Sequence, residues 1–216
     1  FTEVQGGIIE TGKDQIKGSS NDWYTVQNFT AIRNLGTQLV LGCSEMPLMQ
    51  FGAINTGRYQ AGAMPQSTHV FSWPMNNYWV TNFNADQRGG HSWIYYLTTS
   101  DNISDSFASR FGWGSRVPYL TRILPGEGTG DDKREGAFIE GWPVNVLLVN
   151  AYPSEDGKTI LIHLRETDGK ETHLSLKNGI TGNQLAISGS DVTSKSIIDS
   201  DNTIKPLESK FFLIKT

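Results

Sequence analysis

Aromatic rings and side-chain amides alternate between Trp73 and Tyr96. An amide offers both a hydrogen-bond donor and an acceptor, and a flat ring stacks on the apolar face of a pyranose, so the combination is typical of sugar recognition. The same composition also fits an aromatic-rich sandwich core whose asparagines cap turns. Under the first interpretation, the residues predicted to contact carbohydrate or another domain are Asn76, Asn77, Trp79 and Asn82.

The acidic residues offer no recognisable catalytic pair. Glycoside hydrolysis usually needs two carboxylates on opposite sides of a sugar, and 22 Asp and Glu residues make chance pairs easy to find. Asp131 and Asp132 lie in a glycine-rich charged loop, which is a poor place to hold a fixed geometry. Glu140 and Glu166 adjoin predicted strands, and a solvated strand face explains both. We therefore predict no catalytic residue in this chain.

The histidines and the single cysteine do not form a metal-ligand pattern. The histidines, His69, His91, His163 and His173, are not spaced from one another or from a carboxylate as in a helical zinc motif. His163 and His173 are predicted to face each other on paired strands as an exposed pair. Cys43 ends an apolar run, which favours a buried, inert thiol. We expect neither a metal nor a cofactor within the chain.

Charge and hydropathy narrow the range of partners. The net charge is −4, and Lys133-Arg134 is the longest basic cluster. Binding to a nucleic acid or an anionic membrane requires a concentrated basic surface, so we expect neither as a partner. The apolar runs are too short to cross a bilayer. One cysteine is compatible with a cytoplasmic, a periplasmic or a secreted location alike. Because the chain opens at Phe1 rather than Met, we expect it to begin inside a longer gene product or after processing.

Short β-rich runs separated by Gly, Asn and Asp dominate the chain, and helical periodicity is nearly absent. Alternating apolar residues and two Asp-Gly turns predict a three-stranded meander over 144–151, 159–165 and 171–177. One short helix is predicted at 104–111, where Phe107 and Phe111 lie four residues apart. Further strands are predicted at 37–43, 69–73, 78–83, 92–99, 184–187, 194–198 and 209–214.

The best domain boundary lies at 125–136, which holds four glycines and a run of five charged residues. Such a segment does not pack, so it is predicted to be a solvated loop or linker. The resulting organisation is a β-domain over 1–125, a linker over 126–139 and a smaller β-sandwich over 140–216. The fold class is therefore all-β, built from antiparallel sheets.

Residues 75–83, Met-Asn-Asn-Tyr-Trp-Val-Thr-Asn-Phe, resemble a segment in the C-terminal region of family 38 glycoside hydrolases, with Gln87 and Gly89 in step. Three weaker matches occur in the family's order: Met-Pro-Leu at 46–48, Arg-Phe-Gly-Trp at 110–113, and a strand-turn-strand segment at 144–167. One departure is Ile-Tyr-Tyr at 94–96, where the family often has Phe-Arg-Tyr. The resemblance covers nearly the whole chain.

This resemblance implies part of a large galactose-mutarotase-like β-sandwich followed by a smaller C-terminal β-sandwich. The family's nucleophilic aspartate and its ligands for a divalent metal such as zinc lie in an N-terminal α/β domain, and no part of this chain resembles that domain. We therefore expect a non-catalytic C-terminal region of an α-mannosidase-like enzyme, inactive alone, whose partners are the catalytic domain of the same protein and a glycan. A free-standing carbohydrate-binding β-sandwich module and a purely structural β-domain are the alternatives.

Strand geometry sharpens the expectation for the aromatic-amide stretch. On a regular strand Asn77 and Trp79 point one way while Tyr78 and Asn82 point the other, so both faces carry polar groups. A buried asparagine without partners costs roughly 1–3 kcal/mol. We therefore expect backbone hydrogen bonds to fix at least two of the amides in a loop that faces the catalytic domain. In the whole enzyme, Trp79 or a neighbouring amide is expected to touch sugar.

Overall fold

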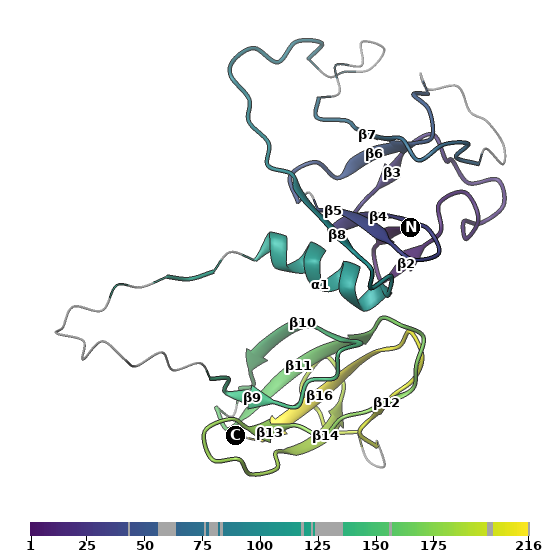
Figure 1. Ribbon diagram of the computed structural model, residues 1–216. Coiled ribbons are helices and arrows are strands. Elements are labelled where there is room, and N and C mark those ends of the chain that lie inside the picture. The colour runs from purple at the N-terminus through teal and green to yellow at the C-terminus, as the bar shows by residue number, and fades with distance from the viewer. Residues whose placement is uncertain are drawn as a thin grey trace. The chain divides into compact units, whose positions relative to one another are not determined.

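The computed structural model describes residues 1–42, 44–55, 64–75, 77, 82, 84–117, 119–121, 123, 136–155, 157–197 and 201–215. It divides into two compact units, Phe1–Pro118 and Tyr119–Thr216. Both units consist mainly of antiparallel strands (Figure 1), so the predicted all-β, sandwich-like class is confirmed. Most of the predicted linker at 126–139 lies outside the described residues.

The first unit contains two antiparallel sheets. The larger has the order β2 (Gly7–Ile9), β1 (Thr2–Val4), β4 (Phe29–Arg33), β5 (Gln38–Gly42) and β8 (Tyr96–Ser100). The smaller has the order β3 (Tyr24–Thr25), β6 (Leu48–Phe51) and β7 (Val70–Ser72). Strand β5 confirms the strand predicted at 37–43, and β7 confirms the one predicted at 69–73. Strand β8 covers the last part of the strand predicted at 92–99. The strand predicted at 78–83 lies outside the described residues, apart from Asn82, as does Cys43.

Helix α1 spans Asp105–Arg116 and confirms the predicted helix start. The Ser104 side chain caps it by accepting a hydrogen bond from the backbone N–H of Phe107, and Asp105 in the first turn forms an ion pair with Arg33 of β4. The helix continues past the predicted end at residue 111 through two glycines. Gly112 lies directly against Phe29, since a Cβ at Gly112 would be 2.8 Å from the Phe29 Cβ. The glycine thus permits close packing of α1 on the sheet.

We expect Gly112→Ala to lower the free energy of unfolding by about 1–3 kcal/mol, the usual cost of overpacking. Phe29 is fully buried and cannot yield easily, so the clash outweighs the roughly 1 kcal/mol by which alanine favours a helix over glycine. Gly114→Ala in the same helix is the matched control, because no described atom lies within 4 Å of its added Cβ. Urea unfolding followed by circular dichroism measures both, and equal stability of the two variants would refute the packing argument.

The second unit is a two-layered structure. One layer is an antiparallel sheet with the order β10 (Val146–Pro153), β11 (Thr159–Glu166), β16 (Ser209–Lys215) and β14 (Ala186–Ser190). The other consists of two short strand pairs, β12 (Thr172–His173) with β15 (Thr203–Ile204), and β13 (Lys177–Asn178) with β9 (Ile139–Glu140). The β10–β11 hairpin and the terminal strand β16 confirm the predicted strands at 144–151, 159–165 and 209–214.

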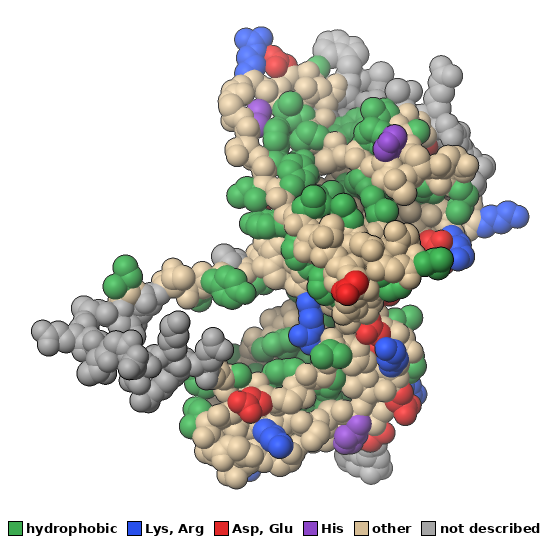
Figure 2. All heavy atoms as spheres, viewed as in Figure 1, with side chains coloured by type: hydrophobic (Ala, Val, Ile, Leu, Met, Phe, Trp, Pro, Cys, Tyr) green, Lys and Arg blue, Asp and Glu red, His purple; other side chains and the backbone are tan. Residues whose placement is uncertain are grey.

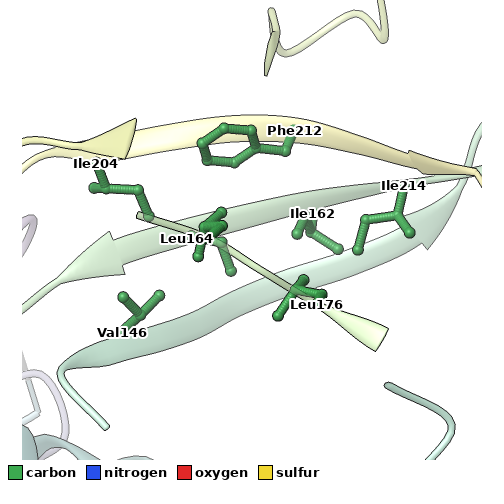
Figure 3. Packing of buried hydrophobic residues seen from close by; sticks show 8 residues of the cluster. Val146, Ile162, Leu164, Leu176, Ile204, Phe212 and Ile214 are labelled. Atoms are coloured by element: carbon green, nitrogen blue, oxygen red, sulfur yellow. The ribbon is translucent and has the colours of Figure 1, made fainter. Parts of the chain in front are cut away.

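The prediction that residues 171–177 form the third strand of a meander, next to 159–165, is wrong. The second neighbour of β11 is β16, with Leu161 opposite Leu213, and β12 pairs with β15 instead. After the turn at Gly169 the chain crosses to the other layer, where Leu174 and Leu176 are buried in the same core cluster as Ile162, Phe212 and Ile214 of the sheet (Figure 3). The alternation of Leu174 and Leu176 indicates that one face of this segment is buried. It does not tell whether the segment is a third strand of the same sheet or a strand in the facing layer.

Two smaller predictions fail with the meander. His163 lies opposite Asn150 and Phe211, and its ring stacks on Phe211 with centroids 4.3 Å apart, whereas His173 pairs with Thr203. The two histidines therefore do not form a cross-strand pair. The predicted strand at 194–198 is reduced, among the described residues, to an isolated bridge between Ser190 and Ser196.

Candidate functional site

The predicted sugar-contacting stretch is only partly described. Asn76 and Trp79 lie outside the described residues, and Asn77 and Asn82 are exposed. Their hydrogen bonding to the backbone and their contact with sugar therefore stay predictions. Exposure of the two described amides leaves them accessible to a partner or a ligand.

The described aromatics around this stretch contact side chains of the first unit. Trp73 meets Trp23 edge-on with ring centroids 5.2 Å apart, and His91 stacks on Trp93. Tyr95, which stands where the family often has arginine, shares a hydrogen bond of 2.8 Å between its hydroxyl and that of Ser72. Because His91 and Tyr95 are exposed and the three tryptophans are half-buried, these described aromatics do not form a buried core.

Glu166, at the end of β11, is not on a solvated strand face as predicted, because only 1% of it is exposed. Its carboxylate accepts hydrogen bonds from the backbone N–H groups of Asp168, Gly169 and Leu207 and from the Asn145 side chain, at 2.8–2.9 Å. Burial raises the pKa of the Glu166 carboxyl, but these hydrogen bonds outweigh it and hold the pKa below its usual value. A carboxylate enclosed in this way ties loops together and cannot reach a substrate.

Glu3 of β1 is a second enclosed carboxylate, fully buried in the first unit. One oxygen accepts a hydrogen bond from the Asn28 side-chain amide and the other from the Trp113 indole N–H, both at 2.8 Å. It therefore joins α1 to the sheet. By contrast, Glu140 of β9 is exposed, as predicted. Among the described residues, no three His, Cys, Asp or Glu side chains gather in a way that could hold a metal ion.

A cleft of about 810 Å³ lies over one face of the second unit's four-stranded sheet. Cross-strand register gives the order of the strands beneath it: Tyr152, Leu161, Leu213 and Ser188 are successive neighbours on β10, β11, β16 and β14, and all of them except the fully buried Leu161 line the cleft. Neighbours directly opposite one another project from the same face. This face is the one opposite the core cluster that contains Ile162 and Ile214.

Two loops form the walls of the cleft. One is the β10–β11 turn, which contributes Ser154 and Glu155, and the other is the segment at 192–196 after β14. We call this space the sheet cleft. Its lining residues come from positions 152 to 215, so no local sequence motif marks it, and sequence reasoning missed it. The hydroxyl-bearing lining residues are Tyr152, Ser154, Thr159, Ser188, Thr193, Ser194 and Ser196.

A hydrogen-bonded turn holds the second wall in place. The Asp191 carboxylate accepts hydrogen bonds from the backbone N–H and the hydroxyl of Thr193, both at 2.8 Å, and from the backbone N–H of Lys195 at 3.0 Å. Hydrogen bonds from Lys195 and Thr193 keep the pKa of Asp191 below its usual value. The Tyr152 hydroxyl donates to the carbonyl oxygen of Val192 at 3.2 Å, which fastens the same loop to the sheet.

On the face shown in Figure 2, Lys and Arg side chains lie among Asp and Glu side chains. The described part of the chain contains no helix with the length and apolar character that a membrane span requires.

No protein-family model matches the sequence, and a search of curated proteins found no match. A protein in glycosyl hydrolase family 38 from Enterococcus faecalis, known from a crystal structure at 2.55 Å, is similar in structure, with a TM-score of 0.57 and 10% sequence identity. The similarity covers 93% of this chain and 23% of that chain. At this identity it shows a shared fold, and this chain spans about a quarter of the length of the protein it resembles.

Proposed function

We propose that this chain is the non-catalytic C-terminal region of an α-mannosidase-like glycoside hydrolase, which supports a catalytic domain of the same protein and contributes to glycan binding. The observation that carries the proposal is the structural similarity to a family 38 protein over 93% of this chain. The segment at 75–83, which resembles that family's C-terminal region, adds independent support because the match is one of sequence rather than fold. Binding and support, rather than catalysis, also suit a chain in whose described part the two most deeply buried carboxylates, Glu3 and Glu166, are enclosed by donors.

A free-standing carbohydrate-binding β-sandwich module is the second candidate. The sheet cleft favours it, because a hydroxyl-lined depression on a sheet could bind sugar without a catalytic domain. The first candidate predicts that the native polypeptide also contains a catalytic domain, whereas the second predicts a native polypeptide without one.

We expect the native polypeptide to be several times larger than the 23.9 kDa of this chain. Its additional sequence should include an α/β region with aspartate and histidine metal ligands preceding Phe1. Immunoblotting of the source cells with an antibody raised against this chain, followed by intact-mass measurement and sequencing, tests this. A native polypeptide near 23.9 kDa would reject the proposal in favour of the free-standing module.

A further inference from the structure

We infer that the sheet cleft is a binding site for a neutral oligosaccharide; the inference deepens the proposed function and rests on it only for the choice of a mannose-containing probe. The cleft volume of about 810 Å³ lies within the range of roughly 300–1,000 Å³ typical of small-molecule sites. It is therefore large enough for a short oligosaccharide.

The floor of the cleft offers an apolar surface beside hydroxyl groups. Tyr152 and Leu213 both line the cleft, on either side of Leu161; Leu213 is only 8% exposed, so the Tyr152 ring, which is 37% exposed, is the apolar surface that can contact the C–H face of a pyranose. Ser188 borders Leu213 on the other side and is exposed. A sugar ring needs this combination, because its faces are apolar while its rim carries hydroxyls.

The hydroxyls differ in what they already bind. Ser154 and Thr159 share a hydrogen bond, and Thr193 donates to Asp191. In the described part of the chain, the side-chain hydroxyls of Ser188, Ser194 and Ser196 make no hydrogen bond within the protein. Each hydroxyl can donate once and accept twice, which matches the mixed donors and acceptors around a sugar.

The charges in the cleft favour an uncharged ligand. Its charged lining residues are Glu155 and Lys215, which carry opposite signs. A phosphorylated or carboxylated ligand would meet one cation and one anion, whereas tight anion binding uses clustered cations or arginine forks. A neutral polyhydroxylated ligand is neither attracted nor repelled as a charge by Glu155 and Lys215, so their opposite signs do not weaken its binding.

The wall is preorganised by the Asp191 turn and by the hydrogen bond from Tyr152 to Val192. Less loop ordering is then required when a ligand binds, which improves affinity without new contacts. The geometry thus combines an apolar floor, available hydroxyls and a fixed wall in one concave surface.

Titration of the ¹⁵N-labelled 216-residue chain with α-mannobiose, maltose, cellobiose and mannose 6-phosphate tests the inference by NMR. We expect at least one neutral disaccharide to shift amide signals at 152–155, 186–188 and 192–196, with a dissociation constant on the order of 1 mM. Mannose 6-phosphate should bind no more tightly than the best neutral sugar. Ser188→Trp fills the cleft and should weaken binding at least about tenfold, or about 1.4 kcal/mol.

Ser175→Trp is the matched control, because Ser175 is exposed in the same unit but does not line the cleft, and its binding should equal that of the unaltered chain. Should Ser188→Trp fail to fold, Ala186→Trp fills the same cleft from the neighbouring position on that face. Absence of saturable shifts at about 20 mM of every neutral sugar, or shifts that survive both filling substitutions, would overturn the inference.

The outcomes separate this inference from the proposed function. Binding of maltose or cellobiose in the cleft without α-mannobiose would sustain the inference while removing support from an α-mannosidase-like role. An active native mannosidase whose 216-residue region binds no sugar would overturn the cleft inference and leave the proposed function standing.

Discussion

Glu166→Ala is expected to lower the free energy of unfolding of the second unit by about 3–5 kcal/mol. The substitution leaves three backbone N–H groups and the Asn145 amide without their acceptor, and each buried unpaired donor costs about 1–3 kcal/mol. Asp168 and Gly169 are near the surface, so water recovers part of that loss. The remainder is still a large fraction of the roughly 5–15 kcal/mol that holds a domain folded.

Trp142 makes the measurement specific to this unit. It is the single tryptophan among residues 119–216, packs against the core cluster, and donates its indole N–H to the Ile139 carbonyl. Urea unfolding followed by its fluorescence requires a variant in which the other five tryptophans are replaced by phenylalanine. Glu171→Ala, at an exposed position a short distance along the chain, is the control and should change stability by less than about 0.5 kcal/mol. Similar stability of the two variants would show that the Glu166 carboxylate is dispensable.

The contribution of Glu166 should also depend on pH in a defined direction. Its pKa is lower in the folded unit than in the unfolded chain, so the unfolded chain takes up the proton first as pH falls. The stabilisation is therefore fully present above the unfolded value near 4.5 and is lost as pH falls toward the folded value. Glu166→Gln lacks this titration, so the stability gap between it and the unaltered chain should narrow below pH 4.5. A constant gap would contradict the assignment.

Local sequence signals predicted the parts of the fold that local interactions determine. The four-residue spacing of Phe107 and Phe111 predicted α1, and the alternation from 159 to 165 predicted β11, although both faces of that strand carry buried residues such as Leu161 and Ile162. The all-β class follows from many such runs. The course of the chain after Gly169 could not be predicted, because the partners of this segment are distant in sequence: β12 pairs with β15, and Leu174 lies in a core cluster with Phe212.

The candidate sites show the same division. Glu166 and Glu3 look like surface carboxylates in sequence, and only their partners from distant segments show that they are enclosed. The sheet cleft had no sequence signal, because serines and threonines spread from 154 to 196 are unremarkable until four strands bring them together. The aromatic-amide stretch did have a local signal, and its role in sugar contact stays a prediction.

Hydrolysis of 4-nitrophenyl α-mannoside by the native polypeptide and by the 216-residue chain tests the proposed role most directly. Enzymatic hydrolysis needs positioned catalytic groups, which supply accelerations of at least about a millionfold. Because this chain is proposed to lack the nucleophile and the metal ligands, we predict no release of nitrophenol above the uncatalysed rate, with or without added zinc or cobalt. The native polypeptide should turn over the same substrate when supplied with a divalent metal. Turnover by the chain alone, abolished by a single substitution within it, would contradict the account, and so would an inactive native polypeptide.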